Sequence, residues 1–377
     1  MASADNPGSR FLIALLWLLA VTGCEKPPAL SKGERFVAAS DPALHYAGRW
    51  DMTDPTKPRA SWPGFAVSMN IEGRAISVLM TDPGNYYNVE IDGKATRVIG
   101  GRKGKHLKYV LSDDLTPGIH RLQLQRRNIS FEDPTELEGF IVDESAKLNP
   151  PAELTRRIEF IGDSFTAAEG NEAVAATLKW EQKYPVTNFA TGYAALIGKA
   201  MNAEVTAVCR SGSGLVCNWR GGRQLPMGER YGWTLMEQAQ PAWKFEAPHP
   251  DLIVISLGLN DYSGLKKTDG SIGPEDSLKF REAYRALVAQ VRQRHPGTRI
   301  VALAAYLPWI RENIGAVVAA EKAAGHADLS YAEFDKFADG YVADGHPNVA
   351  THHKMAEQIL TQFARSGISA AVGAAGR

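Results

Sequence analysis

The strongest constraint on the fold is an alternation of short apolar runs and helical stretches in the second part of the chain. The apolar runs cover residues 158–161, 205–209, 252–257 and 300–305, and the helical stretches lie near residues 188–201, 276–294, 312–324 and 349–364. Strands that alternate with helices form a parallel sheet covered by helices on both faces. We therefore predict an α/β domain over residues 152–368.

Polar motifs follow three of these runs. Gly162–Phe165 comes after the first run, Ser211–Gly214 after the second and Gly258–Asp261 after the third, and a fourth motif, Asp344–Asn348, lies near the end of the chain. Ligand sites in open parallel sheets lie at the carboxyl ends of the strands. The four motifs are therefore predicted to meet at one edge of the sheet.

The residue types in these motifs suit acyl transfer, which needs a nucleophile, a base and donors for an oxyanion. Ser164 is the candidate nucleophile and His346 the candidate base. The backbone amides of Ser164 and Gly212 and the side-chain amide of Asn260 are the candidate oxyanion donors. Each motif alone has a simpler explanation as a turn or loop. Their joint occurrence in this order favours catalysis.

The first part of the chain shows a different pattern. Apolar residues alternate with polar ones between residues 36 and 147, and turn pairs such as Glu72-Gly73 and Asp92-Gly93 separate the candidate strands. The candidate strands cover residues 65–69, 75–80, 87–91, 108–111 and 119–124. Short strands at this spacing are typical of a β-sandwich or jelly roll.

Residues 1–23 have the pattern of a targeting segment. Arg10 precedes an apolar run over residues 11–20, and the sequence Val21-Thr22-Gly23-Cys24 resembles the lipobox of bacterial lipoproteins. We expect lipid on Cys24 and a tether over residues 24–35, with a plain secretory signal or an uncleaved anchor as alternatives. The expected location is the bacterial cell envelope, anchored by lipid at the outer membrane or periplasmic face, or outside the cell.

Charge and cysteine content limit the possible partners. The chain has 42 basic and 42 acidic side chains, so nothing attracts nucleic acid electrostatically. No metal-ligand spacing is present, and we expect neither a metal nor another cofactor. Cys209 and Cys217 flank the Ser211–Gly214 motif, and they form either a disulfide or two buried free thiols.

The second domain resembles the SGNH (GDSL-type) hydrolase superfamily, on the four motifs given above. With the β-rich domain before it, the chain is similar to carbohydrate esterase family 2, on Gly48–Asp51, Ser61–Phe65 and Gly162–Asn171. The resemblance implies that Ser164 is the nucleophile, His346 the base, and Gly212 and Asn260 the oxyanion partners. It also implies the substrate, which is O-acetyl groups on polysaccharides such as xylan or glucomannan.

The third catalytic candidate, Asp344, departs from the superfamily pattern. The superfamily aspartate usually lies three residues before the histidine, but Ala343 occupies that position here and Asp344 lies two before His346. The shorter spacing redirects the carboxylate. We therefore expect Asp344 to orient the imidazole through its backbone carbonyl rather than through its side chain.

Three other functions compete with polysaccharide deacetylation. A lipid or thioester acylhydrolase would use the same catalytic residues, as would an acyltransferase between glycans. A surface lipoprotein that binds carbohydrate without catalysis would not need all four motif residues intact. Tryptophans on loops suit stacking against pyranose rings, and Trp219 and Trp233 after Gly212 are candidates, with Tyr262 and Trp309 near other strand ends.

Overall fold

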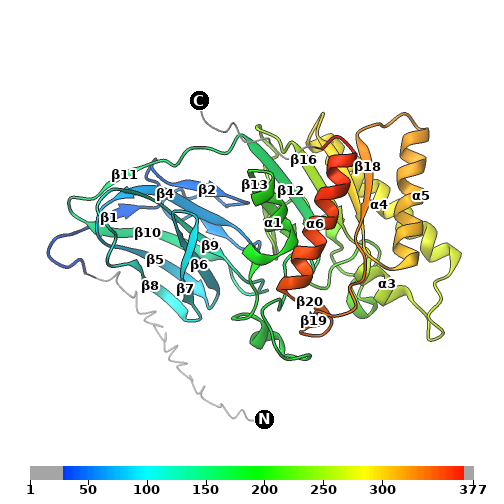
Figure 1. Cartoon of the computed structure of the whole chain (residues 1–377), viewed down its shortest axis with the longest axis horizontal. Helices are drawn as coiled ribbons and strands as arrows, with labels where there is room; N and C mark the ends of the chain where they lie inside the picture. Colours follow the sequence, from blue (N-terminus) through cyan, green and yellow to red (C-terminus); the bar gives the residue numbers. More distant parts are fainter. Residues whose placement is uncertain (1–28, 369–377) are drawn as a thin grey trace, which may run out of the picture.

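The structure is a computed structural model in which residues 29–368 are described. Figure 1 shows an all-β part beside a part in which strands and helices alternate. The targeting segment expected over residues 1–23 and the lipid site expected at Cys24 lie outside the described residues.

The all-β part consists of two antiparallel sheets. One sheet has the order β1-β10-β5-β8 with β3 beside β10, and the other has the order β11-β4-β9-β6-β7 with β2 beside β4. The strands are β1 (Glu34–Ala38), β2 (His45–Ala47), β3 (Arg59–Ala60), β4 (Ala66–Glu72), β5 (Ile76–Pro83), β6 (Tyr86–Ile91), β7 (Lys94–Gly100), β8 (Lys103–Ser112), β9 (Ile119–Arg126), β10 (Thr135–Asp143) and β11 (Lys147–Asn149).

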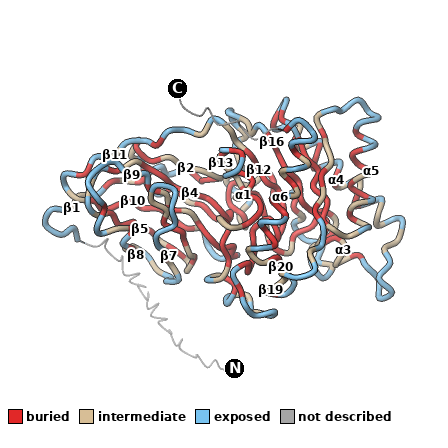
Figure 2. The backbone as a smooth tube through the Cα atoms, viewed as in Figure 1, coloured by how far each residue is buried: buried red, intermediate tan, exposed pale blue. Residues whose placement is uncertain are grey.

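Alternation along the strands builds the core between these sheets. In β9, Leu122 and Leu124 are buried while Gln123 and Gln125 between them are only partly covered. Successive side chains of a strand point to opposite faces, so one face of each sheet can be apolar. Figure 2 shows buried residues along the strands of the first part and along the parallel sheet of the second part.

The second part is built on a parallel sheet of order β13-β12-β16-β17-β18. Its strands are β12 (Arg156–Gly162), β13 (Ala203–Cys209), β16 (Leu252–Ser256), β17 (Arg299–Ala304) and β18 (Leu329–Glu333). Every residue of β16 is buried, which a strand covered on both faces requires. The predicted fold class, a β-sandwich followed by an α/β domain with a parallel sheet, is confirmed.

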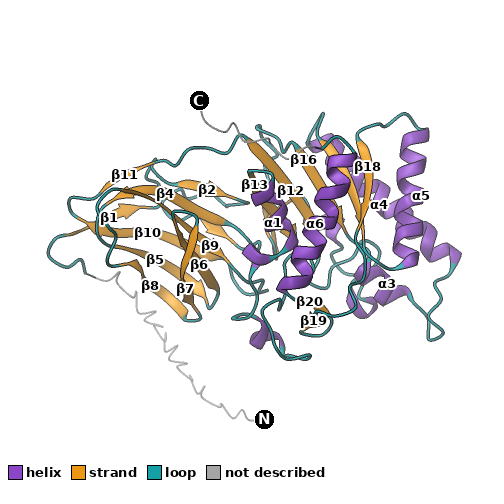
Figure 3. Cartoon of the chain, viewed as in Figure 1, coloured by secondary structure: helices purple, strands orange, loops and turns teal. Residues whose placement is uncertain are grey.

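Two pairs of helices accompany the sheet (Figure 3): α1 packs against α6, and α4 packs against α5. The α-helices are α1 (Tyr193–Ala200), α2 (Met227–Arg230), α3 (Leu259–Leu265), α4 (Pro274–Arg294), α5 (Pro308–Ala323) and α6 (Val349–Arg365). Short elements complete the part: the 3-10 helices η1 (Trp180–Lys183), η2 (Phe189–Thr191) and η3 (Trp219–Gly221), and the hairpins β14 (Trp233–Leu235) with β15 (Gln238–Ala242) and β19 (Tyr341–Val342) with β20 (His346–Pro347).

The sequence pattern did not predict several elements of the second part, among them β18, α3 and the β19–β20 hairpin that carries His346. Strand β18 was not predicted because Leu329–Glu333 mixes apolar and polar residues. Helix α3 begins directly after Gly258, so Asn260 lies in the first turn of a helix rather than in a loop.

A buried arginine joins the two parts. The guanidinium of Arg49, in the first part, donates to the carbonyls of Tyr231 (2.6 Å) and Trp233 (2.9 Å) and to the Glu159 carboxylate (3.3 Å) in the second. Both charged side chains are almost fully buried. Loss of one partner from a buried ion pair typically costs about 3–5 kcal/mol, because the other charge stays buried without compensation. Arg49 therefore links the stability of the two parts.

Trp62 strengthens the same junction. Its buried indole belongs to the hydrophobic core of the second part, and its N–H donates to the carbonyl of Thr234 (2.9 Å). The neighbouring Ser61 hydroxyl accepts a hydrogen bond from the backbone N–H of Met236 (2.7 Å). The first part thus supplies core residues to the second.

Candidate active site

The parallel register brings three motifs to one edge of the sheet. Gly162, the last residue of β12, pairs with Cys209 at the end of β13 and with Ser256 at the end of β16. The three strands therefore end at the same level. Ser164, Gly212 and Asn260 follow these ends within a few residues, as the sequence predicted.

Ser164 lies in the tight turn after β12 and is 9% exposed. A Cβ at Gly162 would lie 2.0 Å from Thr166 Oγ1, so only glycine allows the chain to turn this closely. Within the turn, Asp163 accepts a hydrogen bond from the Phe165 N–H (3.0 Å), and burial raises the pKa of Asp163 to about 7. The motif thus fixes the backbone on either side of the nucleophile.

The Gly212 loop and Asn260 are bound to this turn. The Asn260 side-chain amide donates to Asp163 (3.2 Å) and to the carbonyl of Ser213 (3.0 Å). Gly212 has a φ of 76°, which favours glycine. The structure thus brings the three oxyanion candidates together, and their donation to an oxyanion stays a prediction.

A buried carboxylate shapes the loop after Gly212. Asp261 accepts hydrogen bonds from the backbone N–H groups of Leu215 (2.9 Å), Val216 (2.7 Å) and Cys217 (3.2 Å). Burial raises the pKa of Asp261, although these donors act in the opposite direction. Asp261 therefore stabilises the loop after Gly212, and it lies next to the candidate donor Asn260 in the sequence.

His346 packs against the nucleophile turn. Its ring lies 5.8 Å from the Phe165 ring, measured between centroids, and its Nε2 lies 3.8 Å from Glu169 Oε1. Within residues 29–368, no hydrogen bond joins Ser164 Oγ directly to the ring. Proton transfer between Ser164 and His346 therefore stays a prediction, which this placement supports.

The other ring nitrogen fixes the tautomer of His346. Nδ1 lies 2.6 Å from the carbonyl oxygen of Ala343, and a carbonyl only accepts hydrogen bonds. Nδ1 therefore carries the proton in the neutral ring and donates it to Ala343. Nε2 is left with a free lone pair, which is the state that a general base needs.

The role expected of Asp344 is wrong. The carbonyl at Nδ1 belongs to Ala343, and the Asp344 carboxylate lies 2.9 Å from Lys183 Nζ instead. Ala343 and Asp344 have φ angles of 40° and 67°, so the chain turns sharply between them and His346. This turn brings the carbonyl three residues before His346 to the ring and directs the carboxylate elsewhere.

The disulfide considered for Cys209 and Cys217 is also absent, since both thiols are free and buried. Cys209 is the last residue of β13 and lies in its buried end, whereas the Cys217 thiol lies against the carbonyl of Asp261 (3.8 Å). Burial raises the pKa of the Cys217 thiol to about 11, so it stays protonated and unreactive.

Sequence reasoning missed Glu169 and Lys183. Lys183 Nζ lies 2.7 Å from Glu169 Oε1 as well as 2.9 Å from Asp344. Burial opposes the charge on Lys183, but the two carboxylates outweigh it and raise its pKa. Glu169 has a weak sequence signal as a charged residue within the Gly162–Asn171 block, whereas Lys183 has none.

The aromatic candidates differ in position. Trp219 is 54% exposed, and its backbone N–H donates to the carbonyl of Gly212 (2.8 Å). Trp233 lies at the junction of the two parts, where its carbonyl binds Arg49. Tyr262 and Trp309 contact each other at the start of α3 and α5 (6.1 Å between ring centroids). Trp219 is therefore the candidate that combines exposure with a direct link to the Gly212 loop.

The first part reaches this region through Phe131. Its ring stacks on Trp180 of η1 (4.6 Å between centroids), and the Arg210 guanidinium lies over it at 4.2 Å. Arg210 directly precedes the Ser211–Gly214 motif. The β-sandwich thus contacts the loops that carry the site.

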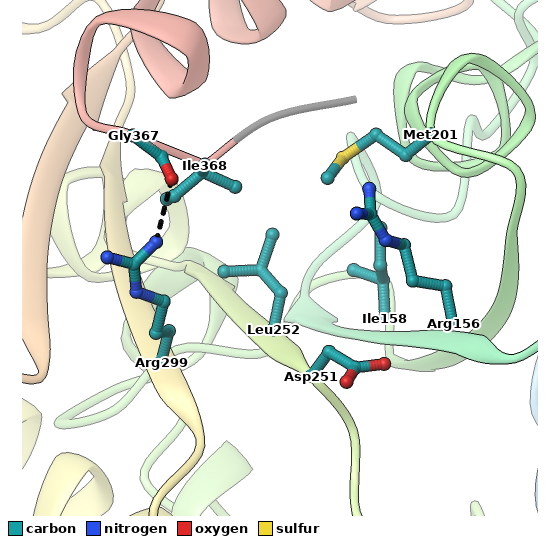
Figure 4. Close-up of a pocket in the computed structure, with 8 residues that line it drawn as sticks. All are labelled: Arg156, Ile158, Met201, Asp251, Leu252, Arg299, Gly367 and Ile368. Atoms are coloured by element: carbon teal, nitrogen blue, oxygen red, sulfur yellow. Dashed lines mark hydrogen bonds between the residues drawn. The ribbon is translucent and has the colours of Figure 1, made fainter. Parts of the chain in front are cut away.

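A cavity outside the site lies at the opposite edge of the sheet (Figure 4). Arg156, Leu252 and Arg299, which begin β12, β16 and β17, line it together with Ile158, Met201, Asp251, Gly367 and Ile368. It therefore lies at the amino ends of the strands, away from Ser164.

No group of three or more His, Cys, Asp or Glu side chains that could hold a metal ion occurs among residues 29–368. Over the same range, no helix has the length and apolar character needed to cross a membrane.

Comparison with known proteins identifies the family. Residues 46–151 match the model of the carbohydrate esterase 2 N-terminal domain, and residues 160–354 match that of the GDSL-like lipase/acylhydrolase family. The structure of a family two carbohydrate esterase from Clostridium thermocellum in complex with cellohexaose is 30% identical, with a TM-score of 0.78 and 86% of this chain and 100% of that chain covered. The chain belongs to carbohydrate esterase family 2.

Two curated relatives of this family 2 member cover most of it. Cellulase/esterase CelE of Acetivibrio thermocellus is 30% identical over 332 residues, which is 86% of this chain but only 39% of that protein. An acetylxylan esterase / glucomannan deacetylase of Cellvibrio japonicus is 28% identical over 342 residues, which is 85% of this chain and 90% of that protein. The chain thus spans well under half of CelE and nearly all of the Cellvibrio protein.

The hydrogen bond from His346 to Ala343 predicts unequal effects of substitutions in the site. Asp344→Ala leaves this backbone contact in place and removes only the link to Lys183, so we expect kcat/KM for 4-nitrophenyl acetate to fall about tenfold. Ser164→Ala and His346→Ala remove the nucleophile and the base, and we expect losses of about 10³-fold or more. A loss for Asp344→Ala as deep as that for His346→Ala would restore Asp344 as the aspartate of a full catalytic triad.

Proposed function

We propose that this family 2 member is a serine esterase that removes O-acetyl groups from polysaccharides such as xylan or glucomannan. The observation that carries the proposal is the meeting of Ser164, the Gly212 loop, Asn260 and His346 at one edge of the parallel sheet. The fixed Nδ1–H tautomer of His346 adds a base with a free lone pair beside the nucleophile turn.

The reaction follows from these groups. Ser164 Oγ attacks the acetyl carbonyl while His346 Nε2 takes the serine proton, and the resulting oxyanion is stabilised by N–H donors of Ser164, Gly212 and Asn260. Collapse breaks the bond to the sugar oxygen, which leaves with the proton from His346. Water, deprotonated by His346, then attacks the acetyl group on Ser164, and Ser164 Oγ leaves with the proton from His346 as acetate is released.

The names of the relatives support the substrate class. Proteins of Cellvibrio japonicus that cover 85% and 91% of this chain are called acetylxylan esterase / glucomannan deacetylase. The Clostridium thermocellum structure was obtained with cellohexaose bound. The names give acetylxylan and glucomannan for the first two proteins and cellohexaose as a ligand of the third, and we propose a ligand of the same class for this chain.

Acetate release tests the proposal. Purified protein is incubated with acetylated xylan, acetylated glucomannan and acetylated bacterial glycans, and Ser164→Ala serves as the control. We expect acetate from a plant glycan with wild type alone, and faster hydrolysis of 4-nitrophenyl acetate than of the octanoate. Preference for octanoate would favour a lipid or thioester acylhydrolase, and glycan binding without esterolysis would favour a non-catalytic lectin.

A substitution at Trp219 tests whether a polysaccharide is the substrate. An exposed indole can stack on a pyranose face. Such stacking contributes to substrate affinity without taking part in the reaction. Trp219→Ala should therefore raise KM for acetylated polysaccharide about tenfold and leave hydrolysis of 4-nitrophenyl acetate unchanged. Equal losses on both substrates would show that Trp219 supports the Gly212 loop instead of the glycan.

We also propose that lipid on Cys24 anchors the protein at the bacterial cell envelope. The support is the apolar run over residues 11–20 followed by Val21-Thr22-Gly23-Cys24. Metabolic labelling of a bacterial host with an alkyne fatty acid should mark the wild-type protein and leave Cys24→Ala unmarked. Labelling of both, or of neither, would contradict lipidation at Cys24 and favour a plain secretory signal or an uncleaved anchor.

A further inference from the structure

The turn that precedes His346 has an unusual backbone. Ala343, Asp344 and Gly345 have φ angles of 40°, 67° and 88°, and two of these residues carry side chains. Such residues rarely adopt this region, and they keep it only where surrounding contacts hold them. Because the Ala343 carbonyl accepts the hydrogen bond from His346 Nδ1, the orientation of the ring depends on this turn.

The segment after Glu169 holds the turn in place. The backbone N–H of Ala343 donates to the carbonyl of Ala175 (3.0 Å), and that of Asp344 donates to Ala176 (2.6 Å). Lys183 adds a side-chain link, with Nζ 2.9 Å from Asp344 Oδ2. Three contacts therefore attach the turn to one segment, and Lys183 supplies the ionic one.

Lys183 also holds a carboxylate beside the base. Glu169 Oε1 lies 2.7 Å from Lys183 Nζ and 3.8 Å from His346 Nε2. The side chains of Lys183 and Glu169 are only 10% and 4% exposed, so water cannot replace the ammonium as a partner of this carboxylate. Without Lys183, the same oxygen would have the His346 ring as its nearest ionic partner among the described residues.

We propose that Lys183 is a positioning residue for His346. It fixes the left-handed turn through Asp344, and it holds the Glu169 carboxylate so that this group does not bind a protonated Nε2 and keep the ring from acting as a base for Ser164. In this position the Glu169 carboxylate faces the imidazolium that forms during the reaction. Its distance from Nε2 stabilises the positive charge of the ring without a hydrogen bond that would compete with Ser164. The inference rests on the proposed hydrolysis at Ser164 and adds a device that orients its base.

The main test is Lys183→Met, assayed with 4-nitrophenyl acetate. Misplacement of a catalytic group by about 1 Å can cost about 100-fold in rate, and we expect a fall of this size in kcat with KM changed less than about twofold. Lys183→Arg keeps the charge and should recover most of the loss. The matched control is Lys108→Met, which removes another lysine–glutamate pair (Lys108–Glu34, 3.0 Å) in the first part and should match wild type.

A second substitution tests the mechanism. Glu169→Gln in the Lys183→Met background replaces the unpaired charge with a neutral amide, so part of the lost kcat should return. If Lys183→Met fails to fold by circular dichroism, Asp344→Asn removes one arm of the network at a side chain that is 38% exposed. We expect Asp344→Asn to lower kcat about tenfold.

Labelling with a fluorophosphonate separates this inference from the proposed substrate. The probe reports activation of Ser164 without any acetyl group, and Lys183→Met should be labelled much more slowly than wild type. Labelling and kcat equal to wild type in folded Lys183→Met, or in Asp344→Asn where it is the folded variant, would overturn the inference. Wild type that is labelled rapidly but releases no acetate would instead refute the acetyl esterase proposal.

Discussion

The level ends of three parallel strands are the constraint on which the site depends. Because Gly162 pairs with both Cys209 and Ser256, the loops that follow β12, β13 and β16 start from one line. Residues that lie about fifty or more positions apart in sequence then need only short loops to meet. The register of the sheet, set by buried apolar strands, is therefore also the register of the catalytic groups.

Two buried carboxyl groups hold the loops at the strand ends in a fixed position. Asp261 accepts hydrogen bonds from the loop after Gly212, and Asp163 connects the nucleophile turn to Asn260. Both carboxyl groups have raised pKa values because they are buried. Unfavourable burial of this kind is tolerated where several backbone donors are satisfied at once. The two acids thus act as connectors between motifs, although neither is placed to take part in the reaction.

The sequence predicted what depends on local pattern. Apolar periodicity located β12, β13, β16 and β17, and the motifs at their ends located Ser164, Gly212, Asn260 and His346. What it missed depends on contacts between distant segments. The left-handed turn at Ala343 decides which carbonyl reaches His346, and the pairing of Lys183 with Asp344 spans residues that no local pattern relates. The sequence also could not predict the distance in space between Cys209 and Cys217.

Arg49 has a consequence for how this architecture can be inherited. Its guanidinium enters the second part and compensates the Glu159 carboxylate, while the rings of Tyr231, Trp243 and Phe245 surround it at 5.1–5.3 Å. A recombination event that transferred only the catalytic half to another gene would leave the Glu159 carboxylate without this cationic partner. Inheritance of the hydrolase part alone would therefore cost it this buried ion pair and the stability that depends on it.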